Sequence, residues 1–323
     1  MNLKELLTPS GKPTRQAFSE RMAEFGKIDK EFAVFEADIG YSTFSYLFGE
    51  AFPERYFNMG IAEQNEMAAA AGMASTGRTV VVCGYGVFLT MRALETVRSF
   101  VCYPNLNVKI LSSHGGITAA VDGATHQATE DIAFMSTLPN MKVQCPADPV
   151  AAVKLFDTAI LTPGPVFTRL MRDSLFDIYD NKIDFPMGGS HVLREGKDLT
   201  ILTYGDVVFQ ALGAAEFLEK KGVDVEVIDC YSIKPLDIVT VLESAKKTGC
   251  VLVAENHQRR NGLGYEVARF LLGEYPVPFE NLGLDDTFGE SGDYPSLIHK
   301  YGFSAECIVE SSERLVYKKL KST

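Results

Sequence analysis

The densest group of polar, potentially reactive residues follows an apolar run at residues 108–111. It contains His114, Asp122 and His126, together with three glycines that let the backbone turn tightly. Histidine changes its charge near neutral pH and both donates and accepts protons. A loop that holds two histidines and an aspartate at the carboxyl end of a strand is therefore a candidate active site. The alternative is a turn in which both histidines satisfy backbone groups.

A second candidate is Glu63, which stands between a short stretch ending in Gly60 and a run of four alanines at residues 68–71. Alanine is the best helix former, and small residues let another backbone approach closely. Glu63 is thus expected at the beginning of a buried helix, where a carboxylate is costly unless it is paired or protonated. The alternative is an ordinary capping or surface glutamate, which is the commoner role of an isolated Glu.

Two further groups follow other predicted strands. Tyr85 and Phe88 come after the run 79–83 and offer aromatic rings to a flat ligand, although such residues more often belong to the core. Asp38 and Ser42 follow the run 32–35. They are expected at the edge where open α/β sheets bind ligands.

The spacing of these groups implies a parallel sheet. Apolar runs typical of strands occur at residues 32–35, 79–83, 108–111, 141–144 and 165–167, and helical stretches separate them at 88–100, 130–138 and 150–160. Strands that alternate with helices indicate a parallel sheet covered on both faces. Turn-forming residues at 180–189 precede a second alternation, with strands at 199–202, 223–228 and 251–254. We therefore expect two doubly wound α/β domains with mainly parallel sheets, residues 1–185 and 190–323.

Composition excludes several classes of protein. The formal net charge is −11 and no basic stripe is present, which argues against binding to nucleic acid. The six cysteines are scattered without a Cys-x-x-Cys pair, so we expect reduced thiols and neither a disulfide frame nor a zinc site. We find no signal peptide and no apolar run long enough to cross a bilayer. A cytoplasmic protein with no membrane partner is expected.

Five segments occur together in the order and spacing of the transketolase family. They are Gly60–Asn65, Phe88–Arg98, Asp122–Gln127, Leu138–Met141 and Cys145–Asp148. Over essentially its whole length the sequence resembles the pyrimidine-binding and C-terminal domains of that family. Full-length transketolases also have an N-terminal domain in which Gly-Asp-Gly and a downstream Asn hold Mg²⁺ and the diphosphate of thiamine diphosphate. No such pair occurs here in the right context, so the sequence resembles the C-terminal half of a split transketolase.

This resemblance implies a cofactor site shared between two kinds of subunit. An N-terminal partner subunit would hold Mg²⁺ and the diphosphate, while this chain would hold the pyrimidine ring of thiamine diphosphate. The alanine-rich helix would lie at a subunit interface and give a homodimer of this chain within a heterotetramer. The implied reaction is transfer of a two-carbon ketol unit between sugar phosphates.

The resemblance also assigns roles to the cofactor residues. Glu63 would hydrogen-bond the aminopyrimidine ring and stabilise its imino tautomer, whose nitrogen then takes the proton from the thiazolium carbon. Phe88 would stack on the pyrimidine, with Tyr85 and Arg92 beside it. Glu63 is thus the first of three implied catalytic residues.

On the substrate side, the resemblance makes His114 and His126 the other two catalytic residues, which would handle protons at the hydroxyl and carbonyl oxygens. Asp122 would bind a sugar hydroxyl, and Asp38 would lie deeper along the sugar channel. A guanidinium fork binds phosphate oxygens bidentately, so arginines suit the far end of the sugar. The implied phosphate grip consists of Arg15, Ser42 and Arg169.

Two alternative functions stay open. The beta subunits of 2-oxo-acid dehydrogenases share the fold and the glutamate, but they usually carry His-Ser-Gln where this chain has Thr125–Gln127, and they lack the phosphate grip. A non-catalytic scaffold subunit would have no need for the residues of a proton relay. Departures from the family pattern at Gly115, Val121 and Leu94 lie close to the sugar and leave the donor and acceptor open.

Overall fold

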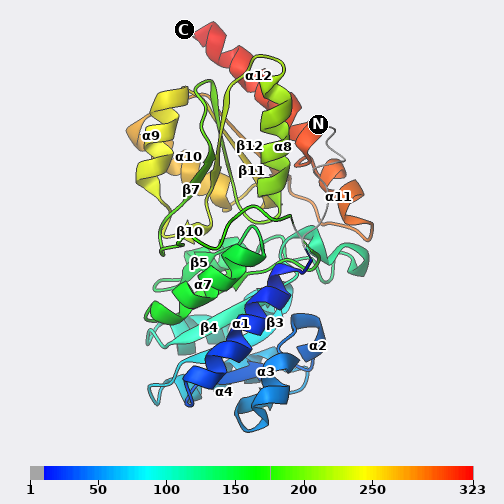
Figure 1. Ribbon diagram of the computed structural model, residues 1–323, viewed down its shortest axis with the longest axis vertical. Coiled ribbons are helices and arrows are strands. Elements are labelled where there is room, and N and C mark those ends of the chain that lie inside the picture. The colour runs from blue at the N-terminus through cyan, green and yellow to red at the C-terminus, as the bar shows by residue number, and fades with distance from the viewer. Residues whose placement is uncertain (1–10, 175, 323) are drawn as a thin grey trace.

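The computed structural model describes residues 11–174 and 176–322. Two α/β domains lie one above the other along the long axis of the molecule (Figure 1), with the N-terminal domain below and the C-terminal domain above. Each domain is built on one mainly parallel sheet. The fold class expected from the alternation of strands and helices is therefore confirmed.

The N-terminal domain contains a seven-stranded sheet with the order β10-β5-β6-β4-β3-β1-β2. Its strands are β1 (Ala33–Glu36), β2 (Tyr56–Asn58), β3 (Val80–Tyr85), β4 (Val108–Ser113), β5 (Lys142–Gln144), β6 (Val166–Arg169) and β10 (Ser232–Lys234). Strands β1 to β6 pair in parallel, whereas β10 comes from the C-terminal half of the chain and pairs antiparallel with β5. Every residue of β1, β4 and β6 is buried. Burial on both faces explains why these strands are mostly continuous apolar runs.

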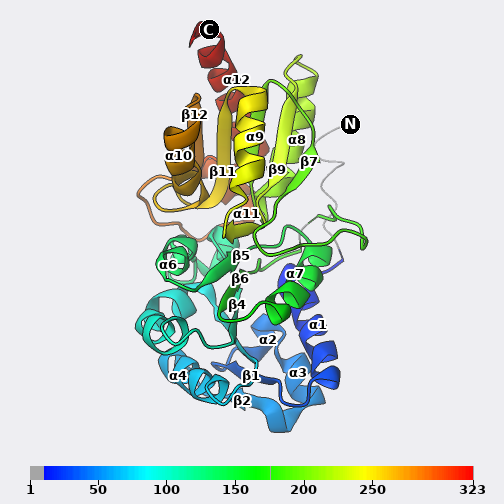
Figure 2. The same ribbon diagram turned by 90° about the vertical axis from the view of Figure 1, so that its left-hand side faces the viewer.

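Helices cover both faces of this sheet. They are α1 (Thr14–Ile28), α2 (Gly40–Thr43), α3 (Tyr46–Ala51), α4 (Glu63–Ala74), α5 (Leu94–Thr96), α6 (Asp131–Thr137) and α7 (Pro149–Leu161), with 3₁₀ turns at Pro53–Arg55 and Ile117–Asp122. Helices α1 and α7 lie on one side of the sheet and α4 and α6 on the other (Figure 2). Phe18 and Phe156 pack in the core of the first side, and Met67 and Met135 pack in the core of the second.

The helix expected at residues 88–100 is irregular. Two π-helical segments, η2 (Phe88–Arg92) and η3 (Val97–Cys102), flank the short α5. A π-helical turn bonds residue i to i+5 and is found frequently at functional sites. Here the first π-helical segment begins and ends with two residues of the predicted cofactor site, Phe88 and Arg92.

The C-terminal domain contains a five-stranded sheet with the order β12-β11-β8-β9-β7. Its strands are β7 (His191–Arg194), β8 (Leu199–Thr203), β9 (Val225–Asp229), β11 (Val251–Gln258) and β12 (Phe279–Leu284). Its helices are α8 (Val207–Glu219), α9 (Ile238–Thr248), α10 (Leu263–Glu274), α11 (Tyr294–Lys300) and α12 (Ala305–Ser322). Strand β7 runs antiparallel to β9, and the other pairs are parallel. Within the described residues no helix is long and apolar enough to cross a membrane.

The loop after β4 lies where the two domains meet. At the carboxyl end of β11, the backbone N–H of Gln258 donates to the carbonyl oxygen of Thr129, which ends the polar segment after β4. The C-terminal domain therefore packs directly against the segment in which the sequence places two histidines.

Candidate functional site

The predicted site residues follow the carboxyl ends of neighbouring strands. Asp38 follows β1, Glu63 follows β2, Tyr85 ends β3 and His114 follows β4. These strands are adjacent in the order β4-β3-β1-β2. Four segments that are far apart in the sequence therefore come to one edge of the sheet, which is where open α/β sheets bind ligands.

Glu63 is the first residue of α4 and is 3% exposed, which confirms the predicted buried carboxylate at a helix start. Its Oε2 accepts a hydrogen bond of 2.7 Å from Nη1 of Arg92. The same guanidinium lies over the ring of Phe88, with 4.4 Å between its Cζ and the ring centroid. A carboxylate, a cation and an aromatic face thus converge at one point, and the positive end of the helix dipole adds to the field there.

Four rings cluster beside this point. The ring centroids of Tyr85 and His114 are 4.2 Å apart, and those of Phe88 and His126 are 5.5 Å apart. Tyr85 also lies 5.8 Å from His126. The Nδ1 atom of His126 is 2.9 Å from the hydroxyl of Thr125. The structure therefore brings both predicted catalytic histidines against the two predicted cofactor aromatics.

His114 is 2% exposed and has a strongly altered titration. Burial, followed by the neighbouring charges of Arg15, Arg172 and His126, lowers the pKa of His114 to about 3. Its imidazole is therefore neutral at neutral pH. A neutral ring has one nitrogen that donates and one that accepts a hydrogen bond, which suits a group that handles protons at a substrate oxygen.

Two arginines lie beside the loop that carries His114. The Nε of Arg15 donates to the carbonyl oxygen of Arg172 at 2.7 Å, and its Nη1 donates to the carbonyl oxygen of Ser42. The Nε of Arg172 lies 3.8 Å from Oδ2 of Asp122. Burial, together with the charge of Arg172, lowers the pKa of Arg15. The two positive charges repel each other, and an anion bound beside both arginines would relieve that repulsion.

The predicted phosphate grip needs one correction, because Arg169 is fully buried. Its Nε donates to Oδ2 of Asp131 at 2.8 Å, and its Nη2 donates to the carbonyl oxygens of Ala128 and Asn256 at 3.1 and 2.8 Å. Its Nη1 has no hydrogen-bond partner within the described residues, but the side chain is 0% exposed, so we infer that Arg169 is a structural group. The arginine that lies beside the other grip residues is Arg172, which the sequence analysis missed.

Asp38 and Ser42 line a hollow of about 470 Å³ between the ends of β1 and β2 and the helices α2 and α3. The carboxylate of Asp38 is exposed and accepts a hydrogen bond of 3.0 Å from Nδ2 of Asn58. Because the Ser42 carbonyl also accepts from Arg15, this hollow borders the arginine pair. The role of Asp38 along a sugar channel stays a prediction.

One acid that the sequence analysis passed over is Glu66, which lies one helical turn beyond Glu63. It is fully buried, and within the described residues neither of its carboxyl oxygens has a hydrogen-bond partner. Burial, reinforced by the charges of Glu36 and Glu63, raises the pKa of Glu66 well above its usual range. Burial therefore favours the protonated, uncharged form of this carboxyl. The signal in the sequence is an acid at i+3 from Glu63, next to an apolar run.

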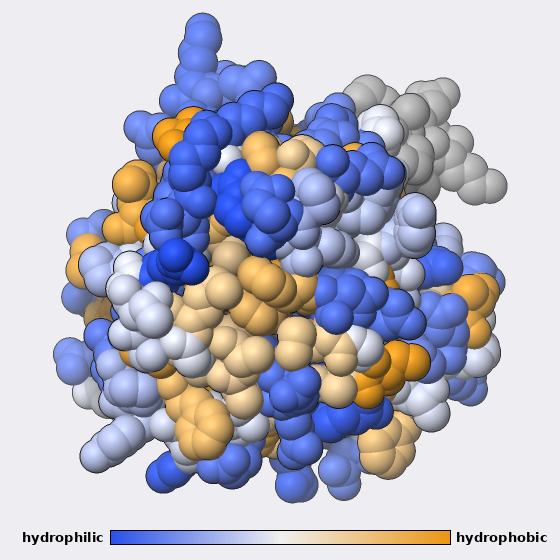
Figure 3. All heavy atoms as spheres, turned by 90° about the horizontal axis from the view of Figure 1, so that it is seen from below, coloured by the Kyte–Doolittle hydropathy of each residue, from blue (hydrophilic) through white to orange (hydrophobic). Residues whose placement is uncertain are grey.

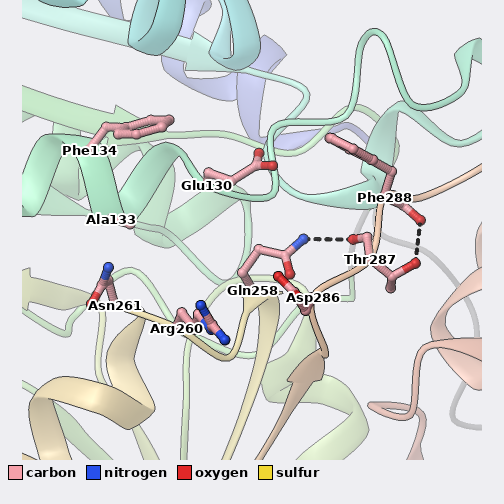
Figure 4. Close-up of a pocket in the computed structure, with 9 residues that line it drawn as sticks. All are labelled: Glu130, Ala133, Phe134, Gln258, Arg260, Asn261, Asp286, Thr287 and Phe288. Carbon is pink, nitrogen blue, oxygen red and sulfur yellow. Dashed lines mark hydrogen bonds between the residues drawn. The ribbon is translucent and has the colours of Figure 1, made fainter.

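A second hollow, of about 290 Å³, lies between the domains, and no predicted site residue lines it. The side chains drawn in Figure 4 come from the region of α6, from the end of β11 and the segment after it, and from the segment after β12. Over residues 11–174 and 176–322, no group of three or more His, Cys, Asp or Glu side chains is placed to hold a metal ion.

Comparison with known families and proteins agrees with this architecture. The transketolase pyrimidine-binding domain matches residues 10–176, and the transketolase C-terminal domain matches residues 188–308. A provisionally named transketolase C-terminal section of Methanocaldococcus jannaschii is 37% identical over 302 residues, which covers 93% of this chain and 95% of that protein. A 6-deoxy-6-sulfo-D-fructose transketolase subunit of a Clostridium species is 35% identical over 305 residues, which covers 94% and 95% of the two chains.

Among solved structures, a split-gene transketolase described as an inactive β4 tetramer matches with a TM-score of 0.88 at 40% sequence identity. The match covers 96% of this chain and all of the other. Two transketolase domains match in sequence order, two relatives match over nearly their whole length, and a solved split-gene transketolase has the same fold. The chain belongs to the transketolase family, of which it carries the pyrimidine-binding and C-terminal domains.

Proposed function

We propose that this chain is the C-terminal subunit of a split transketolase and transfers a two-carbon ketol unit between sugar phosphates with thiamine diphosphate. Membership of the transketolase family implies dependence on that cofactor. The observation that carries the proposal is the convergence of Glu63, Phe88 and the two histidines at one edge of the sheet. Activity requires an N-terminal partner subunit.

The groups around Glu63 fit an aminopyrimidine ring. The guanidinium of Arg92 is planar, donates an N–H to the Glu63 carboxylate and lies on the face of Phe88. An aminopyrimidine is also planar, carries N–H donors on one edge and stacks on an aromatic ring. The guanidinium fits between the Glu63 carboxylate and the Phe88 ring, and a flat heterocycle fits the same space. Because both cannot occupy that space, the Arg92 side chain has to move aside when the cofactor binds.

The residues of this chain then have distinct tasks. Thiamine diphosphate, when bound, supplies a thiazolium carbon that acts as a nucleophile toward a carbonyl. Glu63 orients the pyrimidine and holds a proton at its ring nitrogen, while Phe88 packs against its face. His114, kept neutral by burial, and His126 handle protons at the hydroxyl and carbonyl oxygens of the sugar.

The arginine pair fixes the far end of the substrate. Arg15 and Arg172, with Ser42, bind the phosphate, and Asp122 accepts a hydrogen bond from a sugar hydroxyl. The relative named for 6-deoxy-6-sulfo-D-fructose favours a second substrate class, a sulfonated sugar. Sulfonate and phosphate are both tetrahedral anions that a guanidinium pair binds.

The rest of the cofactor site belongs to the proposed partner, which holds Mg²⁺ and the diphosphate. We assign the contact between two copies of this chain to α4, where Gly72 is exposed and Ala68 and Ala69 are only half-buried. Apolar side chains gather in the middle of the face at the N-terminal-domain end of the molecule (Figure 3). That face suits a homodimer within a heterotetramer. All six cysteines are free thiols, which favours a cytoplasmic enzyme.

Calorimetric titration tests the split site. Thiamine diphosphate with Mg²⁺ is titrated into this chain alone and then into the chain mixed with a candidate N-terminal subunit. We expect binding only in the mixture. Tight binding to the lone chain would contradict the split site.

Substrate assays on the mixture test the reaction. Xylulose 5-phosphate should act as a donor of the ketol unit, and 6-deoxy-6-sulfofructose should do so instead if the substrate is a sulfonated sugar. Decarboxylation of pyruvate without ketol transfer would favour a 2-oxo-acid dehydrogenase subunit and contradict the proposal.

A further inference from the structure

The loop that carries the histidines has an unusual backbone. His114 and Ala120 have φ angles of 63° and 49°, in a region that residues other than glycine rarely adopt. Gly116, between them, has a φ of 60°. Such residues persist only where the surrounding structure fixes them, and they cluster at functional sites. The contacts that surround this loop therefore matter for its shape.

Asn256, in β11 of the C-terminal domain, contacts the middle of the loop. Its Oδ1 accepts a hydrogen bond of 2.9 Å from the backbone N–H of Ile117. A Cβ atom added at Gly116 would clash with the same oxygen, so the loop backbone packs directly on this side chain. Asn256 is fully buried, and water therefore does not compete for the Ile117 N–H.

The other end of the Asn256 amide is fixed within the C-terminal domain. Its Nδ2 donates to Oδ2 of Asp206 at 2.8 Å, and the hydroxyl of Tyr294 donates to the same carboxylate oxygen. Asp206 immediately precedes α8, and Tyr294 begins α11. These contacts determine the orientation of the amide, because a flipped amide would set its NH₂ group against the Ile117 N–H and its oxygen against a carboxylate.

Two more hydrogen bonds tie the same segment to the C-terminal domain. The Nε2 of Gln127 donates to the carbonyl oxygen of Glu290 at 2.9 Å, and the N–H of Gln258 donates to the carbonyl oxygen of Thr129 at 2.8 Å. At the edge of the hollow in Figure 4, the side chain of Gln258 also donates to the carbonyl oxygen of Thr287. The C-terminal domain, to which the sequence analysis assigned no site residue, thus holds this segment on both sides of His126.

We propose that Asn256 is a positioning residue, which acts through the Ile117 amide to fix the loop that carries His114, Asp122 and His126. The C-terminal domain thereby shapes the substrate side of the site in addition to any role in assembly. The effect on turnover rests on the proposed function, whereas the effect on the order of the loop does not.

Amide hydrogen exchange on the chain alone tests whether Asn256 holds the loop. In the wild-type chain, the Ile117 amide should exchange as slowly as the amides in the middle of β11. Asn256→Ala should speed exchange over residues 115–123 by about tenfold or more, because the Ile117 N–H loses its acceptor. Fast exchange at Ile117 in the wild type, or unchanged exchange in the folded variant, would overturn the proposal.

A reciprocal pair of substitutions separates the hydrogen bond from general damage. Asn256→Asp alone sets a second carboxylate against Asp206 and should loosen the loop. Adding Asp206→Asn restores a donor opposite the new carboxylate and should return loop exchange to within about threefold of the wild-type rate. A folded double variant whose loop stays loose would count against the proposal. Thr200→Val is the matched control, because it removes a buried hydroxyl that bonds Ser244 inside the C-terminal domain, and it should leave loop exchange unchanged.

Turnover with the partner subunit gives a second readout. Asn256→Ala should lower kcat for ketol transfer by about tenfold to a hundredfold, the scale expected for a displaced catalytic group. Its affinity for thiamine diphosphate should stay unchanged, because none of the Asn256 hydrogen bonds reaches α4 or η2. Equal losses of cofactor affinity and kcat would indicate a general structural role and overturn the proposal. A wild-type enzyme without ketol transfer would instead refute the proposed function, and the exchange experiment would still decide the role of Asn256.

Discussion

Two ion pairs next to the site have almost the same length but different surroundings. On the side of the site proposed for the cofactor, Glu63 lies 2.7 Å from Arg92, whose side chain is 48% exposed. Behind the histidine loop, Asp131 lies 2.8 Å from Arg169, and both side chains are 0% exposed. Solvent reaches the Glu63–Arg92 pair through the arginine alone, because the Glu63 side chain is 4% exposed, and a pair screened by solvent contributes about 0–1 kcal/mol to stability. Removing one partner of a pair that is buried on both sides costs about 3–5 kcal/mol. Access of solvent, and not distance, therefore separates the two regions.

The difference indicates which part of the site this chain completes by itself. The histidine loop is surrounded by contacts from its own domain and from the C-terminal domain. The pair at Glu63 involves only α4 and η2 and is weak enough for an incoming ring to break. In the proposed function, the partner subunit completes the cofactor side of the site and does not change the conformation of the histidine loop.

The largest effect on turnover is expected from Glu63→Ala, which removes the carboxylate on the cofactor side of the site. The variant should fold, but its ketol transfer should fall by about 10²–10⁴-fold, the contribution of a positioned acid–base group. Thermal unfolding of the chain checks that the variant folds, and turnover of the reconstituted enzyme measures the loss of ketol transfer. Near-normal turnover would remove Glu63 from the mechanism.

Glu66→Gln is the matched control for this variant, since Glu66 lies one turn further along the same helix. Burial raises the pKa of Glu66 and so favours its uncharged form, which glutamine matches in charge and size. Turnover of Glu66→Gln should therefore stay close to that of the wild type. A loss as large as that of Glu63→Ala would show that the deeper carboxyl also takes part.

On the substrate side, Arg169→Ala should act through stability. The substitution leaves the carboxylate of Asp131 buried without its cation, so the free energy of unfolding should fall by about 3–5 kcal/mol. Denaturant unfolding of the chain measures this change. Normal stability in the variant would mean that the buried pair does not hold the loop region together.

Arg172→Ala is the counterpart three residues further on, where the side chain is half-buried. It should cost less than about 1 kcal/mol of stability. Its KM for a sugar phosphate should rise by about tenfold to a hundredfold, because hydrogen bonds to charged groups are worth about 1.5–3 kcal/mol. The opposite pattern, with KM altered by Arg169→Ala alone, would restore Arg169 as the phosphate ligand.

A smaller effect is expected from pH. The pKa of His114 is lowered to about 3 in the folded chain by burial and then by the charges of Arg15, Arg172 and His126, whereas an unfolded histidine titrates near pH 6.5. Between these values the unfolded state binds a proton that the folded state does not, so stability falls as the pH falls. From pH 6.5 to pH 5 we expect a loss of about 2 kcal/mol.

Denaturant unfolding at a series of pH values measures this slope. His114→Gln removes the titrating group, so the difference in stability between variant and wild type should change over this range. A constant difference would show that His114 titrates alike in both states.

The regular elements could be predicted from the sequence because their physical signals are local. Strands buried on both faces are mostly apolar along their length. The apolar runs 79–83 and 108–111 therefore predicted β3 and β4 with ends within two residues of those observed. The burial of Glu63 followed from the small residues behind it. By contrast, Arg169 was assigned to the phosphate grip from the family resemblance alone, and the apolar run 165–167 does not show how far the strand continues. The strand β6 continues to Arg169, and each of its residues is buried.

The contacts between domains had no such local signal. Asn256 lies 139 residues from Ile117 in the sequence. Nothing in the sequence indicates whether an asparagine in a buried strand hydrogen-bonds a loop of the other domain or a neighbour in its own sheet. The same holds for the pairing of β10 with β5, which places a segment of the C-terminal half in the first sheet. Only the packed structure shows that the histidine loop is hydrogen-bonded to the C-terminal domain.

The smallest effect should come from Arg92→Ala, which sharpens the comparison between the two ion pairs. In the free chain, the guanidinium lies against Glu63 and Phe88, where the proposed ring binds. Because the displaced pair is worth at most about 1 kcal/mol, its removal should tighten binding of thiamine diphosphate to the reconstituted enzyme by up to about fivefold, as measured by calorimetry. Arg92→Lys keeps the charge without the flat fork and should bind the cofactor with intermediate affinity. A tenfold loss of affinity in Arg92→Ala would mean that Arg92 stays in contact with the bound cofactor, and the cofactor side would then be as fixed as the histidine loop.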